Sequence, residues 1–198
     1  AIDKIFDRIN DSPENYNLLY QLPTGGGKTV IFSEIARRYL QRKDHKVLIL
    51  THRIELCKQT SNMLTEFEVE NKIIDSDVKE ITNEDNYSCF VAMVETLNNR
   101  IKENKVEIHD IGLVIVDEAH YNSFRKLFKH FENCFILGVT ATPLSSNINL
   151  PMREIYDDLI VGEKISSLIL RCSIVVGTSN FSPHLHSIDI VITTSLFF

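Results

Sequence analysis

The stretch Leu22-Pro23-Thr24-Gly25-Gly26-Gly27-Lys28-Thr29 decides the fold of this 198-residue chain. A short apolar run at residues 17–21 precedes it and predicts a buried strand, and residues 30–40 carry apolar side chains at helical spacing. Small residues let a strand-to-helix turn curl, so that successive backbone N–H groups point inward at an anion. The amino-terminal end of the helix adds positive potential at the same place. The stretch therefore predicts a phosphate-binding loop, or P-loop.

Several residues of this loop have separate parts in holding a nucleoside triphosphate. The backbone groups that would surround the phosphates belong to Thr24, Gly25, Gly26 and Gly27. Lys28 would reach the β- and γ-phosphates, and the Thr29 hydroxyl would bind Mg²⁺. The general pattern G-x-x-x-x-G-K-[ST] has a glycine where this chain has Leu22. An ordinary glycine-rich turn is the alternative, but it hardly explains three glycines followed by Lys-Thr at a helix start.

The bulk composition is that of one ordinary globular domain. Hydrophobic residues make up 43% of the chain and charged residues 24%, and no apolar run is long enough to cross a bilayer. The amino-terminal segment has mixed charge and is not a secretory signal. Because the chain opens on Ala1 without an initiator methionine, we expect it to be part of a longer protein. We predict a cytoplasmic protein without a membrane segment.

The net charge of −6 argues against a globally basic nucleic-acid clamp. Residues 1–60 carry 10 basic and 7 acidic side chains, a balance of +3, whereas the remainder has a balance of −9. Any contact with nucleic acid is therefore expected to be local and directed at the backbone. The four cysteines are far apart and form no C-x-x-C pair, which favours buried free thiols over a zinc site.

Further apolar runs at residues 46–50, 69–74, 88–93, 112–116 and 134–139 predict more strands. Helices are predicted at residues 2–10, 54–67, 94–100 and 122–131, and a polar surface loop at residues 75–86. Strands that are apolar on both faces suit a parallel sheet covered by helices on each side. The predicted fold is thus α/β, with a mainly parallel sheet and helices on both faces. Ligands in such sheets bind beyond the carboxyl ends of the strands.

Polar residues follow the strand at residues 46–50 and the strand at residues 112–116. Thr51 and Arg53 lie at the first of these ends, where Thr51 can also be a simple helix N-cap. Asp117 and Glu118 lie at the second, where Asp117 can hold Mg²⁺ and Glu118 can act as general base on the attacking water. The alternative for this acidic pair is a favourable interaction with a helix dipole.

Two more segments have weaker signals. Thr96 and Arg100 sit on the helix at residues 94–100 and, without further context, are ordinary surface residues. Thr140 and Thr142 follow the strand at residues 134–139, near the same edge of the sheet, and could relay the state of the γ-phosphate. Their alternative is a turn ended by Pro143, in which the threonines only satisfy local backbone groups.

Taken together and in this order, these segments resemble the first motor domain of superfamily 2 DEAD/DEAH-box helicases and translocases. The matching residues are 23–29 (motif I), 51–56 with Gln59 (motif Ia), 96–97 (a T-x-x-T-L-like segment), 117–120 (motif II) and 140–143 (motif III). The resemblance covers residues 1–165 and is nearest to bacterial helicases related to the motor subunits of type I and type III restriction enzymes. In this superfamily motif I needs no glycine at the position of Leu22.

The resemblance implies a RecA-like fold that binds ATP and Mg²⁺ and has a second RecA-like domain as its partner. It implies that Thr51, Arg53 and Thr96 face a nucleic-acid backbone. Thr140 and Thr142 would couple hydrolysis to movement, and His120 would link the nucleotide site to motif III. We expect DNA rather than RNA as the substrate, and a nuclease or specificity module as a further partner.

We therefore expect the ATP-binding half of a nucleic-acid helicase or translocase over residues 1–165, an ATP hydrolase with catalytic residues Lys28, Asp117 and Glu118. Residues 166–198 form a divergent or truncated tail in this prediction. Two alternatives remain, a P-loop ATPase that acts without nucleic acid and a nucleotide-binding regulatory module. The upstream glutamine that reads adenine in this superfamily has no clear counterpart here.

Overall fold

The computed structural model describes residues 2–12, 15–77, 87–106, 108–131, 133–147, 149 and 151–162. The predictions for most of the loop at residues 75–86 and for the tail at residues 166–198, with its boundary at 165, lie outside these residues. Within the described part, no helix is both long and apolar enough to span a membrane.

Strands and helices alternate along most of the described chain. The strands are β1 (Asn17–Gln21), β2 (Lys46–Thr51), β3 (Asn71–Ile74), β4 (Cys89–Met93), β5 (Ile111–Asp117), β6 (Phe135–Thr140) and β7 (Asp158–Val161). The helices are α1 (Ile2–Asp11), α2 (Lys28–Leu40), α3 (Ile54–Glu66), α4 (Val94–Lys102) and α5 (Arg125–Phe128). Two 3₁₀ turns, η1 (Asn122–Phe124) and η2 (Met152–Glu154), complete the described structure.

The strands form one parallel sheet in the order β3-β4-β2-β5-β6-β1-β7. The strand that precedes the P-loop, β1, lies between β6 and β7, and β5 lies at the centre beside β2 and β6. Because every pairing is parallel, the carboxyl ends of all these strands meet at one edge of the sheet. The predicted α/β fold with a parallel sheet is confirmed.

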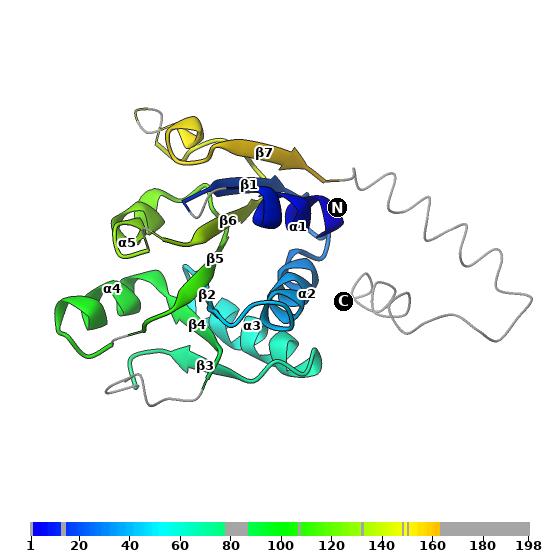
Figure 1. The fold of residues 1–198 in the computed structure, drawn as a ribbon. Coiled ribbons are helices and arrows are strands. Elements are labelled where there is room, and N and C mark those ends of the chain that lie inside the picture. The colour runs from blue at the N-terminus through cyan, green and yellow to red at the C-terminus, as the bar shows by residue number, and fades with distance from the viewer. Residues whose placement is uncertain are drawn as a thin grey trace, which may run out of the picture.

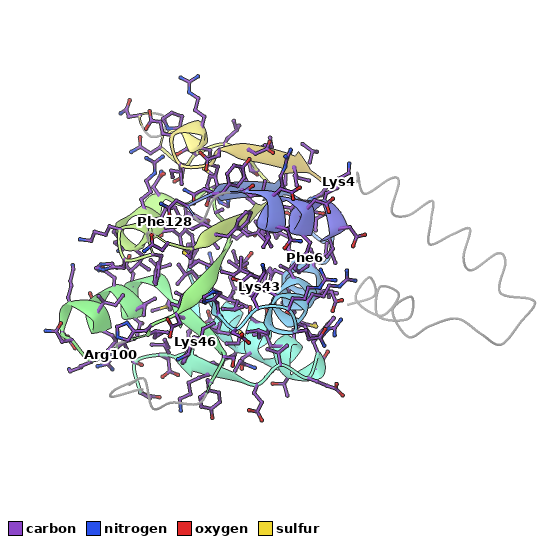
Figure 2. All side chains as sticks on the ribbon, viewed as in Figure 1. Lys4, Phe6, Lys43, Lys46, Arg100 and Phe128 are labelled. Atoms are coloured by element: carbon purple, nitrogen blue, oxygen red, sulfur yellow. The ribbon has the colours of Figure 1, made fainter. Side chains whose placement is uncertain are left out.

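Helices cover both faces of the sheet (Figure 1), with α1, α2 and α3 on one side and α4 and α5 on the other. Side chains of the strands alternate between the two layers, so that in β2 Val47 and Ile49 join the first core while Leu48 and Leu50 join the second. Figure 2 shows Phe6 of α1 and Phe128 of α5 on opposite sides of the sheet. This two-sided burial explains why the strands are apolar on both faces.

Three details differ from the sequence predictions. The helix predicted at residues 122–131 is a 3₁₀ turn followed by the single turn of α5. The helix at residues 54–67 has Arg53 as its N-cap residue, without a side-chain cap, so the N-cap alternative for Thr51 is wrong. The edge strand β7 was not predicted, because its short alternating sequence leaves Leu159 and Val161 exposed.

Candidate functional site

The P-loop joins β1 to α2 at the carboxyl edge of the sheet. Gly25 and Gly27 have φ angles of 78° and 74°, the left-handed region in which glycine is favoured. The Gly26 N–H donates to the Pro23 carbonyl at 2.9 Å, which closes the turn. No side chain caps α2, and its first turn holds no acidic residue. The free N–H groups at this helix start are thus directed at whatever occupies the loop.

Leu22 is the residue that departs from the general P-loop pattern, and the structure gives the reason. Its side chain is 2% exposed and belongs to the core under α1 and α2. Its N–H donates to the Thr140 carbonyl at 2.9 Å, which ties the end of β1 to the end of β6. A Cβ on Gly26 would meet the Leu22 Cγ at 2.9 Å. Leu22 therefore packs closely against the glycine turn and joins it to the apolar core.

Asp117 and Glu118 follow the central strand β5, but their environments differ. Asp117 is 6% exposed, and its Oδ1 accepts the Glu118 N–H at 3.0 Å. Burial, reinforced by the neighbouring Glu118 charge, raises the pKa of Asp117 to about 6, from an ordinary value of 3.8. Glu118 has a φ of 51°, which is unusual for a residue with a side chain. Two adjacent carboxylates thus differ in burial and in backbone conformation.

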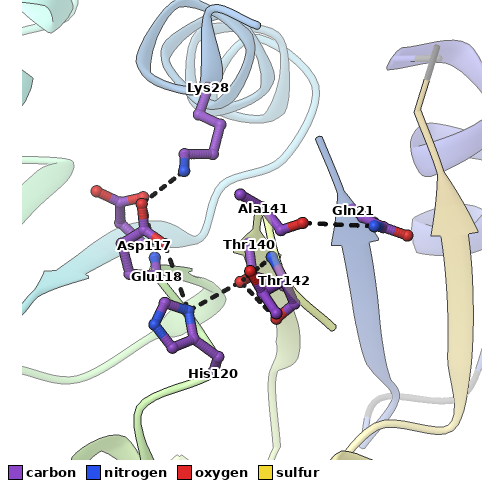
Figure 3. Close-up of polar contacts among 8 residues, drawn as sticks. All are labelled: Gln21, Lys28, Asp117, Glu118, His120, Thr140, Ala141 and Thr142. Carbon is purple, nitrogen blue, oxygen red and sulfur yellow. Dashed lines mark hydrogen bonds and ion pairs between the residues drawn. The ribbon is translucent and has the colours of Figure 1, made fainter. Parts of the chain in front are cut away.

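Lys28 and Glu118 are brought together although 90 residues separate them (Figure 3). The Lys28 ammonium lies 2.5 Å from Oε1 of Glu118, and both side chains are largely buried. The first helical turn of α2 supplies the lysine, and the sharp turn after β5 supplies the carboxylate. The sequence predicted both residues as part of one site, but not that they pair with each other.

His120 connects this pair to the end of β6 (Figure 3). Its Nδ1 lies 2.9 Å from the Thr140 hydroxyl and 3.4 Å from Oε2 of Glu118. The Thr140 hydroxyl also donates to the Thr142 carbonyl and accepts the Thr142 N–H, which fixes the turn that follows β6. Thr140 is fully buried, whereas Thr142 is exposed. A continuous set of polar contacts therefore joins the P-loop lysine to residues 140–142.

The predicted nucleic-acid residues lie in different surroundings. Thr51 is fully buried, and its hydroxyl donates to the Arg53 carbonyl at 3.2 Å and contacts the Cys57 sulfur at 2.9 Å. Its side chain holds the turn at the start of α3 and does not reach the surface. Arg53 is exposed at the carboxyl edge, and Thr96 is half-buried near the start of α4.

Two aromatic residues beside the site were given no role in the sequence prediction. The His52 ring centroid lies 4.0 Å from that of Tyr121, and the Tyr121 centroid lies 4.1 Å from that of His120. His52 directly follows motif Ia's first residue and Tyr121 directly follows motif II. Their sequence positions next to these motifs indicate that both residues lie near the site, but only the packing of β2 beside β5 brings the two rings together.

A parallel sheet with a P-loop after one strand, and an Asp-Glu pair after a central strand, defines the class of P-loop nucleoside-triphosphatases. The family model described as "Type III restriction enzyme, res subunit" matches residues 1–145 of this chain. The chain belongs to this family. Its predicted resemblance to the motor domain of superfamily 2 helicases is confirmed.

Two curated relatives of this chain are named as helicases. The chain is 34% identical over 148 residues to "Putative ATP-dependent helicase IRC3" of Saccharomyces cerevisiae, a match that covers 67% of this chain and 20% of the yeast protein. It is 33% identical over 150 residues to "Putative ATP-dependent RNA helicase MJ1505" of Methanocaldococcus jannaschii, covering 70% of this chain and 19% of that protein. The chain thus spans about a fifth of the length of these relatives.

Solved structures agree with the fold. The UvsW helicase from bacteriophage T4 superposes with a TM-score of 0.61 at 19% identity, over 79% of this chain and 58% of that chain. The type ISP restriction-modification enzyme LlaGI, solved with a DNA substrate mimic, gives a TM-score of 0.62 at 17% identity, over 87% of this chain and 20% of that chain. The RecA-like fold that the motifs implied is therefore confirmed.

Proposed function

We propose that this chain is the ATP-binding half of a DNA helicase or translocase, which couples ATP hydrolysis to movement along the nucleic acid. The Lys28–Glu118 contact carries the proposal, because it brings a phosphate-binding lysine and a candidate general base to one point. The buried Asp117 lies immediately before Glu118. Relatives named as DNA helicases, and a fold neighbour solved with a DNA substrate mimic, support DNA as the substrate, whereas two other relatives are named as RNA helicases.

In this proposal the residues divide the chemistry of phosphoryl transfer between them. Backbone N–H groups of residues 24–29 bind the triphosphate, and Lys28 attracts its β- and γ-phosphates. Glu118 then takes up a proton from the water that attacks the γ-phosphate. His120 keeps the carboxylate of Glu118 oriented through the contact at 3.4 Å.

Asp117 and Thr29 suit Mg²⁺, which prefers oxygen ligands and is usually bound through one or two carboxylates together with phosphate oxygens. The described ion pairs place Lys28 on Glu118 and none on Asp117, and burial raises the pKa of Asp117. A divalent cation would supply the positive charge that this buried carboxylate lacks. Bound Mg²⁺ would neutralise charge that develops on the phosphates during transfer.

Contact with the DNA backbone is assigned to Arg53 and Thr96, which lie after β2 and β4 at the same edge as the P-loop. In this assignment Thr51 acts through the turn that it holds. Thr140 and Thr142, joined to His120, couple the nucleotide site to movement. The partners are a second RecA-like domain and a nuclease or specificity module in the complete protein, and the buried thiols of Cys57, Cys89 and Cys134 suit a cytoplasmic location.

Steady-state ATP hydrolysis by the complete protein tests the proposal. We expect Mg²⁺-dependent turnover that rises with added single- or double-stranded DNA, with RNA as a parallel arm, and that Lys28→Ala abolishes. Because phosphate contacts dominate affinity, Arg53→Ala should weaken DNA binding and reduce its salt dependence. Turnover that no nucleic acid changes would favour the ATPase that acts without nucleic acid, and stimulation by RNA alone would correct the substrate.

A further inference from the structure

Three aromatic rings connect the segment proposed to touch DNA with the segment proposed to activate water. His52 lies between Thr51 and Arg53, at the end of β2. Its ring packs on Tyr121 with a centroid separation of 4.0 Å, and Tyr121 packs on His120 at 4.1 Å. Two elements that are neighbours in the sheet, β2 and β5, thus also touch beyond their carboxyl ends.

His52 has a second aromatic neighbour, which is buried. Its ring stacks on Phe124 at 5.6 Å with an interplanar angle of 6°, and Phe124 is 1% exposed. Burial, helped by the neighbouring Arg53 charge, lowers the pKa of His52. The ring is therefore neutral near pH 7, the state in which it stacks on an aromatic neighbour without the cost of burying a charge.

Tyr121 differs from His52, because its ring contacts His52 and His120 and is also exposed to solvent. It is 39% exposed, so no core depends on its ring. Its N–H donates to the Glu118 carbonyl at 3.1 Å, which binds it directly to the turn that carries the general base. A shift of Tyr121 would therefore act on Glu118 both through this backbone contact and through the ring of His120.

We propose that Tyr121 is a positioning residue that transmits DNA contact at Arg53 to the general base Glu118, by way of the rings of His52 and His120. The inference rests on the proposed function, since it needs DNA bound at Arg53. Binding there restrains residues 52–53, and the His52 ring, which also stacks on the buried Phe124, restrains Tyr121. Tyr121 in turn restrains the His120 ring, so that its 3.4 Å contact with Glu118 is kept in the orientation that activates water.

The test compares ATP turnover with and without DNA in the complete protein. Tyr121→Ala should leave DNA affinity unchanged and lower the ratio of DNA-stimulated to basal turnover on the order of tenfold. Tyr121→Phe keeps the ring and should retain the ratio. His52→Ala should lower the ratio similarly, and the double variant His52→Ala/Tyr121→Ala should lose no more than either single change. Tyr87→Ala, a change just before β4 at the opposite edge of the sheet, is the matched control.

Each contrary result has a distinct meaning. A normal ratio in Tyr121→Ala, or a loss in Tyr121→Phe equal to that in Tyr121→Ala, would overturn the transmission through the ring. An affinity loss in Tyr121→Ala as large as in Arg53→Ala would make Tyr121 a direct DNA contact instead. If unmodified protein shows no stimulation by DNA, the proposed function fails and this inference fails with it.

Discussion

The two edges of the sheet hold their charged residues in opposite ways. At the carboxyl edge Lys28, Asp117 and Glu118 are largely buried and contact one another. At the amino edge a cavity of about 700 Å³ opens at the starts of β2, β5 and β6, where Lys43, His45, Lys129 and His130 line it and are exposed. Exposed charges are solvated and act weakly, whereas buried charges act strongly on each other. The cavity at the amino edge is therefore not where the candidate catalytic residues gather.

The contrast between the two edges depends most on Glu118. Loss of a general base typically costs about 10²- to 10⁴-fold in rate, so Glu118→Gln should reduce steady-state ATP turnover by that factor while nucleotide binding persists. Glu103→Gln, a change at an exposed carboxylate that pairs with Lys105, should leave turnover unchanged. If Glu118→Gln retained full turnover, the general base would have to be another group.

Asp117 gives a prediction about stability and pH. Its native pKa of about 6 exceeds the ordinary 3.8, so the folded chain keeps this proton at pH values where the unfolded chain has lost it. Stability must then fall as pH rises from about 4 to 6, by at most about 3 kcal/mol. Asp117→Asn has no charge to bury, so in metal-free buffer at pH 7 it should be more stable by up to this amount, although inactive.

Urea unfolding of both proteins at pH 4 and pH 7 measures this difference. The gain from Asp117→Asn should be large at pH 7 and small at pH 4, since at the lower pH the folded carboxyl group is protonated and the unfolded one, with an ordinary pKa of 3.8, is only partly ionised. An equal gain at both values would mean that burial of the charge is not the cause. Added Mg²⁺ with a nucleotide should stabilise the unmodified protein and not the variant.

Gly112 tests the amino edge, where we expect structural and not chemical effects. A Cβ at this position would collide with the Tyr39 hydroxyl and lie 2.7 Å from the His45 Cβ. Gly112→Ala should therefore lower the free energy of unfolding by about 1–3 kcal/mol, the usual cost of overpacking. Turnover per folded molecule should stay the same. Tyr39→Phe removes the colliding hydroxyl, and in the double variant it should restore part of the loss.

Lys129→Ala and His130→Ala should have the smallest effects. Both side chains line the amino-edge cavity and are exposed, and surface changes of this kind usually alter stability by no more than about 0.5 kcal/mol. ATP turnover and its stimulation by DNA should remain within twofold, roughly the rate effect of such an energy. A larger loss in either assay would show that the amino edge contributes to function, and would remove the contrast between the edges.

Much of the fold was predictable from local patterns, because the inner strands are buried on both faces and β1, β2 and β4 are each followed by a helix. The elements that sequence missed are those without such a pattern. In β7 the exposed Leu159 and Val161 alternate with less exposed neighbours, which is the weak signature of an edge strand. The helix predicted at residues 122–131 shares its apolar spacing with the shorter η1 and α5, so periodicity alone placed its ends wrongly.

The site was predictable residue by residue, but not contact by contact. Motif spacing identified Lys28 and Glu118, whereas their pairing depends on the left-handed backbone of Glu118 and on the sheet order. Similarly, Thr51 was predicted at the functional edge of the sheet, facing a nucleic-acid backbone or capping a helix, because it ends a strand. Its burial follows from the turn into α3, where its hydroxyl donates to the Arg53 carbonyl and contacts the Cys57 sulfur.

The position of β1 in the sheet has a consequence for synthesis. This strand leaves the ribosome early, yet its partners β6 and β7 come much later, and the Asn17 N–H pairs with the Asp157 carboxylate across 140 residues. At about 5–20 residues per second, the P-loop strand waits roughly 7–30 s for its neighbours. During that interval an apolar strand and its glycine turn are exposed, so the nascent chain passes through an aggregation-prone stage whose length is set by chain order.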